Sequence, residues 1–325
     1  MMLYNRIIRE GTINAPKGHS EPEFALPSTV NWMRALAILL KHNNLNFDNA
    51  CVFYNQQVRR PTITPFHENT VMEQLFLGLH HLSALEKLKD QKPCADYARI
   101  GILAWYYGIT NAASAMTAAK DGSFQEDHAG TARKWDENFA ATGLAMEPFN
   151  WRVSSLVEKT YKSEVDKYRA GNSAKLRHIP TTPTGALGAA AGYLSGSANW
   201  YAEKKIKEIR GSNEFRILNV NNFRTKKAQE LRDSKLSDRS IGFIHLASRY
   251  RGKANYREAL FLAYGKTTEA TLGSFIEDQA EVLRGFLAMA GAFVSRKLGP
   301  ALWADFVADV DANRAFSTSA ASVWS

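Results

Sequence analysis

The sequence predicts a mostly α-helical fold with a few short strands. Apolar side chains recur every three or four residues over several long segments, which is the spacing of a buried helix face. Helix-ending signals follow the two longest segments, Gly122 after one and Gly299-Pro300 after the other. The 325-residue chain is 45% apolar and 22% charged, the ordinary composition of a folded protein with a substantial core.

Residues 1–28 contain several Gly and Pro without a periodic apolar pattern, so we expect an extended N-terminal arm. Residues 29–170 should form the first helical half of the core. Its apolar stripes predict helices over 29–41, 68–89, 96–121, 128–139 and 144–168. Residues 50–64 end in prolines and favour a short strand pair or an irregular loop.

Residues 171–238 are expected to form a Gly/Pro-rich loop followed by a basic insertion. The segment 171–196 is rich in Gly, Ala, Pro, Thr and Ser, which favours a loop or hinge. No Gly-Lys-Ser/Thr follows its glycines, so it is not a phosphate-binding loop of the P-loop type. Phe215–Phe223 is the best candidate for an extended or strand-like piece.

The positive charge of the chain is concentrated in one segment. Between Asn199 and Arg257 there are 15 Lys and Arg against 6 Asp and Glu, so this segment carries the whole formal net charge of +9. A basic surface of this kind is typical of proteins that bind phosphate backbones or another acidic surface. The alternative is a solvated, charged face without a partner.

Residues 239–316 should form the second helical half of the core. A strong apolar stripe predicts a long helix over 269–298, and a shorter one follows over 301–316. The tail, 317–325, is small and polar apart from Val323 and Trp324, so we expect it to be disordered or to act as a docking peptide.

Short motifs in both halves resemble HEPN domains. These motifs are Trp105-Tyr106-Tyr107, Asn111-Ala112-Ala113, His128-x-Gly130 with Trp135 to Phe139, and Arg251-Gly-Lys-Ala-Asn-Tyr256 before the long C-terminal helix. HEPN domains are helical bundles of prokaryotic toxins, CRISPR-associated nucleases and phage-defence proteins. The resemblance is discontinuous, and it implies a HEPN-like bundle interrupted by the basic insertion and acting on RNA in a defence or toxin system.

The resemblance also implies a reaction. HEPN ribonucleases carry an Arg followed a few residues later by a His, and they cleave RNA without a metal, the Arg stabilising phosphate charge and the His moving a proton. Arg239 and His245 have this spacing, although their neighbours differ from the usual ones. Arg251 fits better by its surroundings, but Tyr256 stands where the His is expected, and a tyrosine is the poorer base at neutral pH.

Cations in and beside the insertion are the expected nucleic-acid contacts: Lys204, Lys205, Arg224, Lys226, Lys227, Arg232, Arg249, Lys253 and Arg257. RNA is the favoured partner. Two alternatives stay open, a catalytically silent HEPN-like subunit that binds nucleic acid or a partner protein, and a helical scaffold whose basic face binds an acidic protein. His128 is a further histidine of interest at the start of a helix, where capping is its simplest role.

The remaining expectations are mostly absences. Cys51 and Cys94 have neither metal-ligand nor disulfide-framework spacing, and no cofactor motif is present, so neither metal nor cofactor is expected. Without a signal segment or a run of about 18 apolar residues, a cytoplasmic protein that does not enter membranes is the default. The HEPN resemblance and the apolar C-terminal helices favour a homodimer or a subunit of a defence complex.

Overall fold

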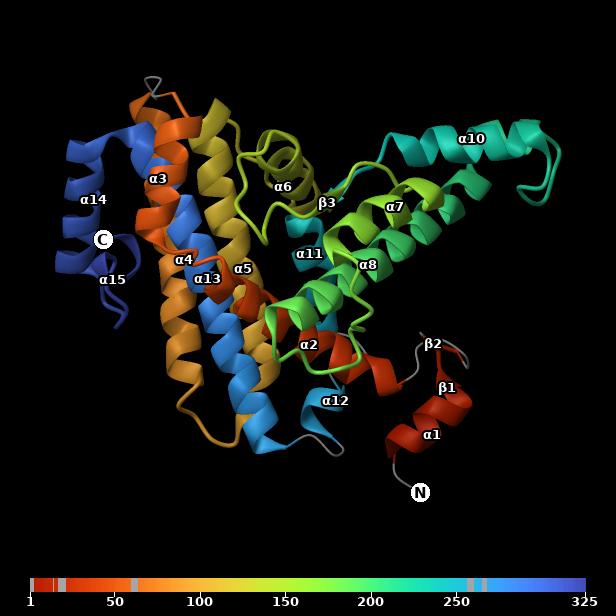
Figure 1. The fold of residues 1–325 in the computed structure, drawn as a ribbon, viewed down its shortest axis with the longest axis horizontal. Coiled ribbons are helices and arrows are strands. Elements are labelled where there is room, and N and C mark those ends of the chain that lie inside the picture. Colours follow the sequence, from red (N-terminus) through yellow and green to blue (C-terminus); the bar gives the residue numbers. More distant parts are fainter. Residues whose placement is uncertain (1–2, 14, 17–21, 60–63, 256–259, 265–267) are drawn as a thin grey trace.

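The centre of the fold is helix α13 (Glu269–Leu298), which is buried over most of its 30 residues (Figure 1). The Thr268 hydroxyl accepts a hydrogen bond from the Thr271 N–H and caps its start, and Gly299, at φ 89°, follows its end. Both ends agree with the sequence prediction. Four helices pack around α13, namely α2 (Pro22–His42), α3 (Phe47–Gln57), α4 (Pro65–Leu88) and α5 (Cys94–Asp121).

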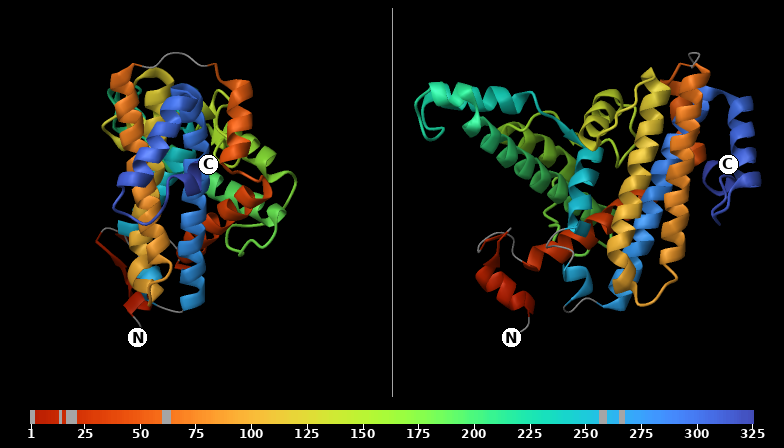
Figure 2. Two further views of the ribbon diagram at one scale, coloured as in Figure 1. Left: turned by 90° about the vertical axis from the view of Figure 1, so that its left-hand side faces the viewer. Right: turned by 180° about the vertical axis from the view of Figure 1, so that it is seen from behind.

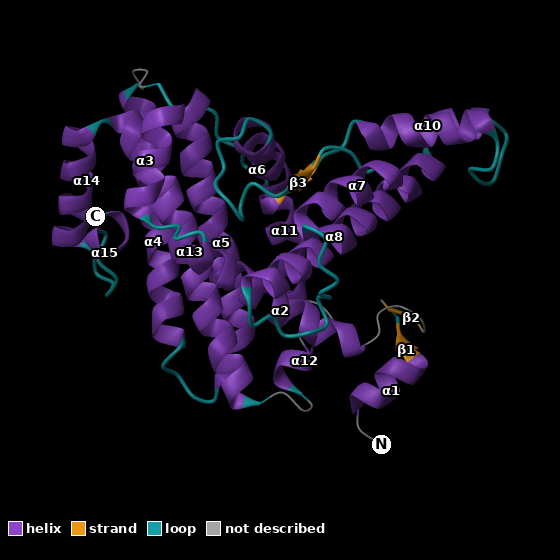
Figure 3. Cartoon of the chain, viewed as in Figure 1, coloured by secondary structure: helices purple, strands orange, loops and turns teal. Residues whose placement is uncertain are grey.

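This computed structural model describes residues 3–13, 15–16, 22–59, 64–255, 260–264 and 268–325, and they form a mostly α-helical fold, as predicted (Figure 3). The further helices are α1 (Leu3–Glu10), α6 (His128–Trp135), a π-helical turn (Asp136–Ala140), α7 (Glu158–Arg169), α8 (Pro183–Gly211), α9 (Asn213–Ile217), α10 (Lys226–Ser237), α11 (Phe243–Asn255), α12 (Leu260–Ala263), α14 (Pro300–Asn313) and α15 (Ala321–Trp324). Two antiparallel pairs make up the described strands: β1 (Gly11–Thr12) with β2 (Ala15–Pro16), and β3 (Arg152–Val153) with β4 (Ile241–Gly242).

Small residues let α5 approach its neighbours closely. A Cβ at Gly108 would lie 2.6 Å from a terminal methyl group of Leu283 of α13, so a larger residue would require Leu283 to shift. The left-handed Gly122, at φ 74°, ends α5 where the sequence predicts it. Tight packing at α5 therefore fixes the core against which α6 and α11 also lie.

Two segments expected to be extended or irregular are partly helical. Residues 50–57 belong to α3, because Asn46 caps its first turn and the Tyr54 side chain is fully buried, donating a hydrogen bond to the Leu144 carbonyl (2.8 Å). The strand-like prediction for 215–223 is also wrong. Ser212 caps the short helix α9, and Phe215 is buried in a small cluster of its own.

Of the segment 171–196, predicted as a loop, residues 171–182 are irregular as predicted, whereas residues 183–196 form the first half of α8. Thr182 caps this helix, and a Cβ at Gly188 would collide with Asn172, so small residues here serve close packing. The sequence also predicts a helix over residues 144–157, but these residues are irregular apart from β3. Pro148, which cannot donate a helical hydrogen bond, lies within it.

The two ends of the chain also differ from expectation. In the N-terminal arm, α1 and the β1–β2 pair precede α2, which begins at Pro22, so the described part of the arm is not extended throughout. The tail docks onto the bundle. Trp324 is 2% exposed, and its indole N–H donates to the Leu287 carbonyl of α13 (2.9 Å).

Helix α8 leaves the bundle and α10 returns beside it, forming a projection seen in both Figure 1 and Figure 2. We call residues 203–239 the basic arm. Ile209, Phe215 and Ala228 form a hydrophobic cluster separate from the main core, joined by Leu218, Val220, Phe223 and Leu231. The basic insertion predicted from the sequence thus lies mostly on a helical hairpin with a small core of its own.

Candidate nucleic-acid interface

The outer surface of the basic arm carries cations that are not neutralised. Exposed Lys204, Lys207, Arg216, Arg224 and Lys227 form no ion pair with any residue that the structure describes. Three of them, Lys204, Arg224 and Lys227, belong to the set predicted from the sequence. Lys207 and Arg216 are additional, and their charge on a projecting helical hairpin is the signal that could have identified them.

Other predicted cations on the arm have acidic partners. Lys205 pairs with Glu208 (3.0 Å), Lys226 with Glu230 (3.9 Å) and Arg232 with Asp233 (2.7 Å). The Arg232 guanidinium also lies 5.8 Å from the Phe223 ring centroid, on the small core of the arm. These three side chains contribute less free charge to the surface than the unpaired ones.

The predicted cations beyond the arm differ in their exposure. Arg249 of α11 is half-buried, and its guanidinium lies against α8, where it donates to the Ser197 hydroxyl (2.8 Å). Lys253 is only 5% exposed and donates to the Ser28 hydroxyl (2.6 Å), so it is not available at this surface. Arg257 lies outside the described residues.

Arg239 and His245, the first predicted catalytic pair, have different surroundings. Arg239 is exposed at the end of the arm, and no contact between the two side chains occurs in the described structure. The His245 imidazole is largely buried, with Nδ1 accepting the Gly242 N–H (3.2 Å) and its ring edge-on to Tyr201. Burial lowers the pKa of His245 to about 4, so this imidazole is neutral at pH 7.

A buried carboxylate organises the junction between the arm and the bundle. Asp136 is 1% exposed, accepts two hydrogen bonds from the Arg152 guanidinium (3.1 Å each) and a third from the Ser240 hydroxyl (2.7 Å). It stands at the start of the π-helical turn. Because Ser240 lies where α10 leads into β4, this network holds the base of the arm against the bundle.

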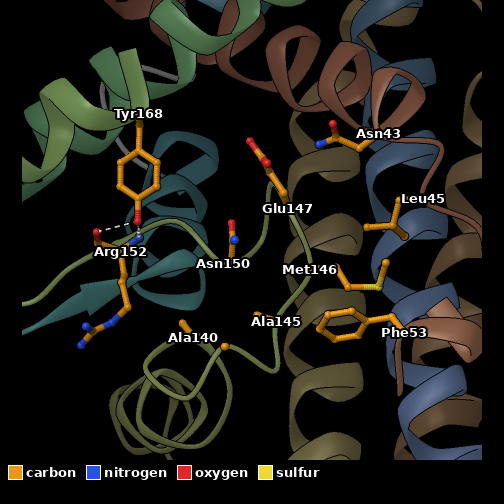
Figure 4. A pocket seen from close by; sticks show the side chains of 11 residues that line it. Asn43, Leu45, Phe53, Ala140, Ala145, Met146, Glu147, Asn150, Arg152 and Tyr168 are labelled. Carbon is orange, nitrogen blue, oxygen red and sulfur yellow. Dashed lines mark hydrogen bonds between the residues drawn. The ribbon is translucent and has the colours of Figure 1, made fainter. Parts of the chain in front are cut away.

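A pocket of about 490 Å³ lies next to this junction, between Tyr168 and Arg152 on one side and Asn43, Leu45 and Phe53 on the other (Figure 4). The Tyr168 hydroxyl accepts a hydrogen bond from the backbone N–H of Arg152 and donates one to the Arg152 carbonyl (3.2 Å each). Glu147 places a carboxylate in the pocket lining, and the Arg152 guanidinium is already paired with Asp136. The pocket therefore does not favour a phosphate.

Arg251, the second predicted catalytic residue, joins a cluster of aromatic side chains and histidines. Its guanidinium lies 5.0 Å from the Tyr106 ring centroid, and the His128 ring lies edge-on to the same tyrosine at 5.3 Å. Burial and then the positive charge of Arg251 lower the pKa of His128. Tyr107 lies between His128 (5.8 Å) and His81 (6.0 Å). Tyr256, the predicted partner of Arg251, lies outside the described residues.

Arg251 and His128, which no sequence motif connects, thus both contact Tyr106. Arg251 comes from α11 and His128 from the start of α6, where the Asp127 carboxylate caps the helix by accepting the Gly130 N–H (2.7 Å). His128 is therefore not the cap, and its half-buried imidazole is free to face the cluster. No spacing rule connects two residues so far apart in the sequence.

No protein-family model, curated protein or solved structure matches the chain significantly. Among the described helices, none combines the length and apolar composition needed to span a bilayer. Within the same residues, no three His, Cys, Asp or Glu side chains gather as metal ligands. The basic arm and the Arg251–His128 cluster are therefore the two candidate functional sites of the described residues.

Proposed function

We propose that this protein binds RNA by its phosphate backbone through the basic arm. The observation that carries the proposal is the set of exposed, unpaired cations Lys204, Lys207, Arg216, Arg224 and Lys227 on a projecting hairpin. Lys and Arg that lack acidic partners can neutralise phosphates and release their counterions, which supplies most non-specific nucleic-acid affinity. The choice of RNA, and a role in a prokaryotic defence or toxin system, rests on the HEPN resemblance.

Salt dependence of binding tests this proposal. Fluorescence anisotropy with a labelled RNA should give an association constant that falls steeply with salt, with a log–log slope of roughly −0.7 per phosphate contact on a single strand. The triple variant Arg216→Gln, Arg224→Gln and Lys227→Gln should reduce this slope by about 2. DNA of the same sequence, measured alongside, tests the preference for RNA.

The matched control removes the same charge elsewhere. Lys87, Lys89 and Arg99 are exposed cations on α4, the turn after it and α5, away from the arm. Their triple Gln variant should keep the wild-type slope except for a small change from net charge. An association constant that does not change with salt concentration would refute the arm as the interface. An equal reduction of the salt slope in both triple variants would refute it as well.

A second candidate function, metal-independent RNA cleavage, is supported by the shared contact of Arg251 and His128 with Tyr106. In such a reaction the 2′-oxygen bonds to the adjacent phosphorus, its proton passes to a neutral imidazole, and the bond from phosphorus to the 5′-oxygen breaks. The leaving 5′-oxygen takes a proton from solvent water, and a guanidinium stabilises the charge on the phosphoryl oxygens. The lowered pKa of His128 favours the neutral imidazole, the form that accepts the proton.

Incubation with labelled RNA in excess chelator tests cleavage. We expect products that end in 2′,3′-cyclic phosphate, lost in Arg251→Ala and His128→Ala and retained in Arg239→Ala. A Tyr256→Ala variant tests the alternative partner of Arg251 predicted from the sequence. Binding without cleavage under all conditions would remove this second candidate and leave a catalytically silent RNA-binding subunit.

A further inference from the structure

One face of α8 carries alternating aromatic and polar side chains at the base of the basic arm. Tyr193, Ser197, Trp200 and Lys204 are spaced three or four residues apart, so they lie along the same side of the helix. Tyr193 is buried at the bundle end, whereas Trp200 is 41% exposed. This face therefore runs from the core out to solvent.

Arg249 of α11 lies across this face. Its guanidinium is 5.6 Å from the ring centroids of both Tyr193 and Trp200, and it donates to the Ser197 hydroxyl between them. Lys204 brings a second cation to 5.8 Å from the Trp200 ring. In the described structure neither cation has an acidic partner, so both charges stay available next to an exposed indole.

The Arg249 guanidinium is preorganised against the α8 face before any ligand binds. The hydrogen bond from Arg249 to Ser197 and its contacts with two rings fix a side chain that is otherwise flexible, which removes part of the entropy cost of binding. Aromatic faces next to ordered cations are the features by which proteins hold unpaired bases and their phosphates. A duplex cannot use the indole in this way, because its bases are already stacked.

We propose that Trp200 is a stacking platform for an unpaired base of single-stranded RNA, with Arg249 and Lys204 contacting the phosphates on either side. The inference rests on the proposed RNA binding and adds the class of RNA and the place where a base is held. Phosphates would continue from this platform along the unpaired cations of the arm. The cations of the basic arm supply the salt-dependent part of the binding free energy. Trp200 supplies the part that comes from stacking on an unpaired base.

Binding of three oligonucleotides separates these two parts. They are a single-stranded RNA, the duplex of the same sequence, and a single strand in which several nucleotides are abasic. Trp200→Leu should weaken binding of the intact single strand by about 5- to 150-fold, the range that corresponds to stacking of one base. It should leave binding of the abasic strand and the salt slope nearly unchanged, and Trp200→Phe should retain most of the affinity.

Phe124 is an exposed aromatic residue (48%) away from the arm, and Phe124→Leu should bind all three oligonucleotides like the wild type. The platform is refuted if Trp200→Leu binds the intact strand as the wild type does, or loses equal affinity for the abasic strand. Failure of every oligonucleotide to bind the wild-type protein would instead refute the proposed function itself. Circular dichroism melting confirms that each variant is folded.

Discussion

The Asp278 carboxylate and the Arg34 guanidinium form an ion pair of 3.0 Å between α13 and α2, yet the second carboxylate oxygen of Asp278 has no hydrogen-bond partner in the described structure. Asp278 is 5% exposed. Burial raises its pKa to about 7, against the opposing effect of Arg34. Desolvation therefore outweighs the ion pair, and the carboxyl group becomes a source of pH-dependent stability.

Replacing Asp278 should remove this dependence. The raised pKa means that folding favours the protonated acid, so its contribution to stability is full below about pH 4 and is lost as the pH rises to 7. Relative to the wild type, Asp278→Asn should gain unfolding free energy on the order of 4 kcal/mol between pH 4 and pH 7. Urea unfolding at both pH values measures it. Asp305→Asn, at an exposed site, is the control, and an equal pH trend in both variants would contradict the argument.

His245 should have the opposite effect on stability at acid pH. Its folded pKa of about 4 lies below the ordinary 6.5, so its contribution is full above pH 6.5 and is lost as the pH falls through 4. The loss should be on the order of 3 kcal/mol. His245→Asn, which keeps an acceptor for the Gly242 N–H, should unfold with a weaker acid dependence than the wild type. Thermal melts at pH 7 and pH 4 test this, with exposed His42→Asn as the control.

Loss of Asp136 should destabilise the junction at the base of the arm. Asp136→Ala leaves the Arg152 guanidinium without its carboxylate, and breaking a buried ion pair from one side costs about 3–5 kcal/mol. The double variant with Arg152→Met should recover part of that free energy, because no unpaired charge remains. Urea unfolding gives both values. Glu158→Ala, which breaks the exposed pair with Lys162, should change stability little. A nearly neutral Asp136→Ala would contradict this role.

Docking of the C-terminal tail should contribute to the stability of the whole bundle. Trp324 packs against Trp303 and Phe306 and fills the space beside Gly291, so Trp324→Ala should cost about 3–5 kcal/mol of unfolding free energy. Gly291→Ala should also be destabilising, because its Cβ would collide with the indole. Differential scanning calorimetry measures both. Ser322→Ala is the local control, and a wild-type melting temperature for Trp324→Ala would disprove the docking role.

The sequence predicts the core helices well because their signals are local. In α5 and α13 the apolar stripes run over many turns, and Gly122 and Gly299 stop them. The loop prediction for 171–196 fails over residues 183–196, for a non-local reason. Its Gly and Ala residues are small because α8 packs closely against Asn172 and Ala174, which composition cannot distinguish from loop flexibility.

The candidate site could be predicted only in part. Net charge identifies the segment that holds Arg224 and Lys227, but not which cations keep a free charge, since that depends on where the acidic side chains fall. The contacts of Arg251 with Tyr106, and of Tyr106 with His128, join three helices. Such contacts arise from packing angles, which no local pattern encodes.

The two ends of the basic arm leave and re-enter the bundle next to each other. Ala202 and Leu236 line the same cavity, and the Leu236 carbonyl accepts the Leu156 N–H (3.0 Å). The arm also holds its own hydrophobic cluster. A segment anchored in this way can be replaced as a unit. A hairpin of different length or charge can be inserted between the same two attachment points without repacking α13. An engineer could therefore graft a foreign domain at these two points.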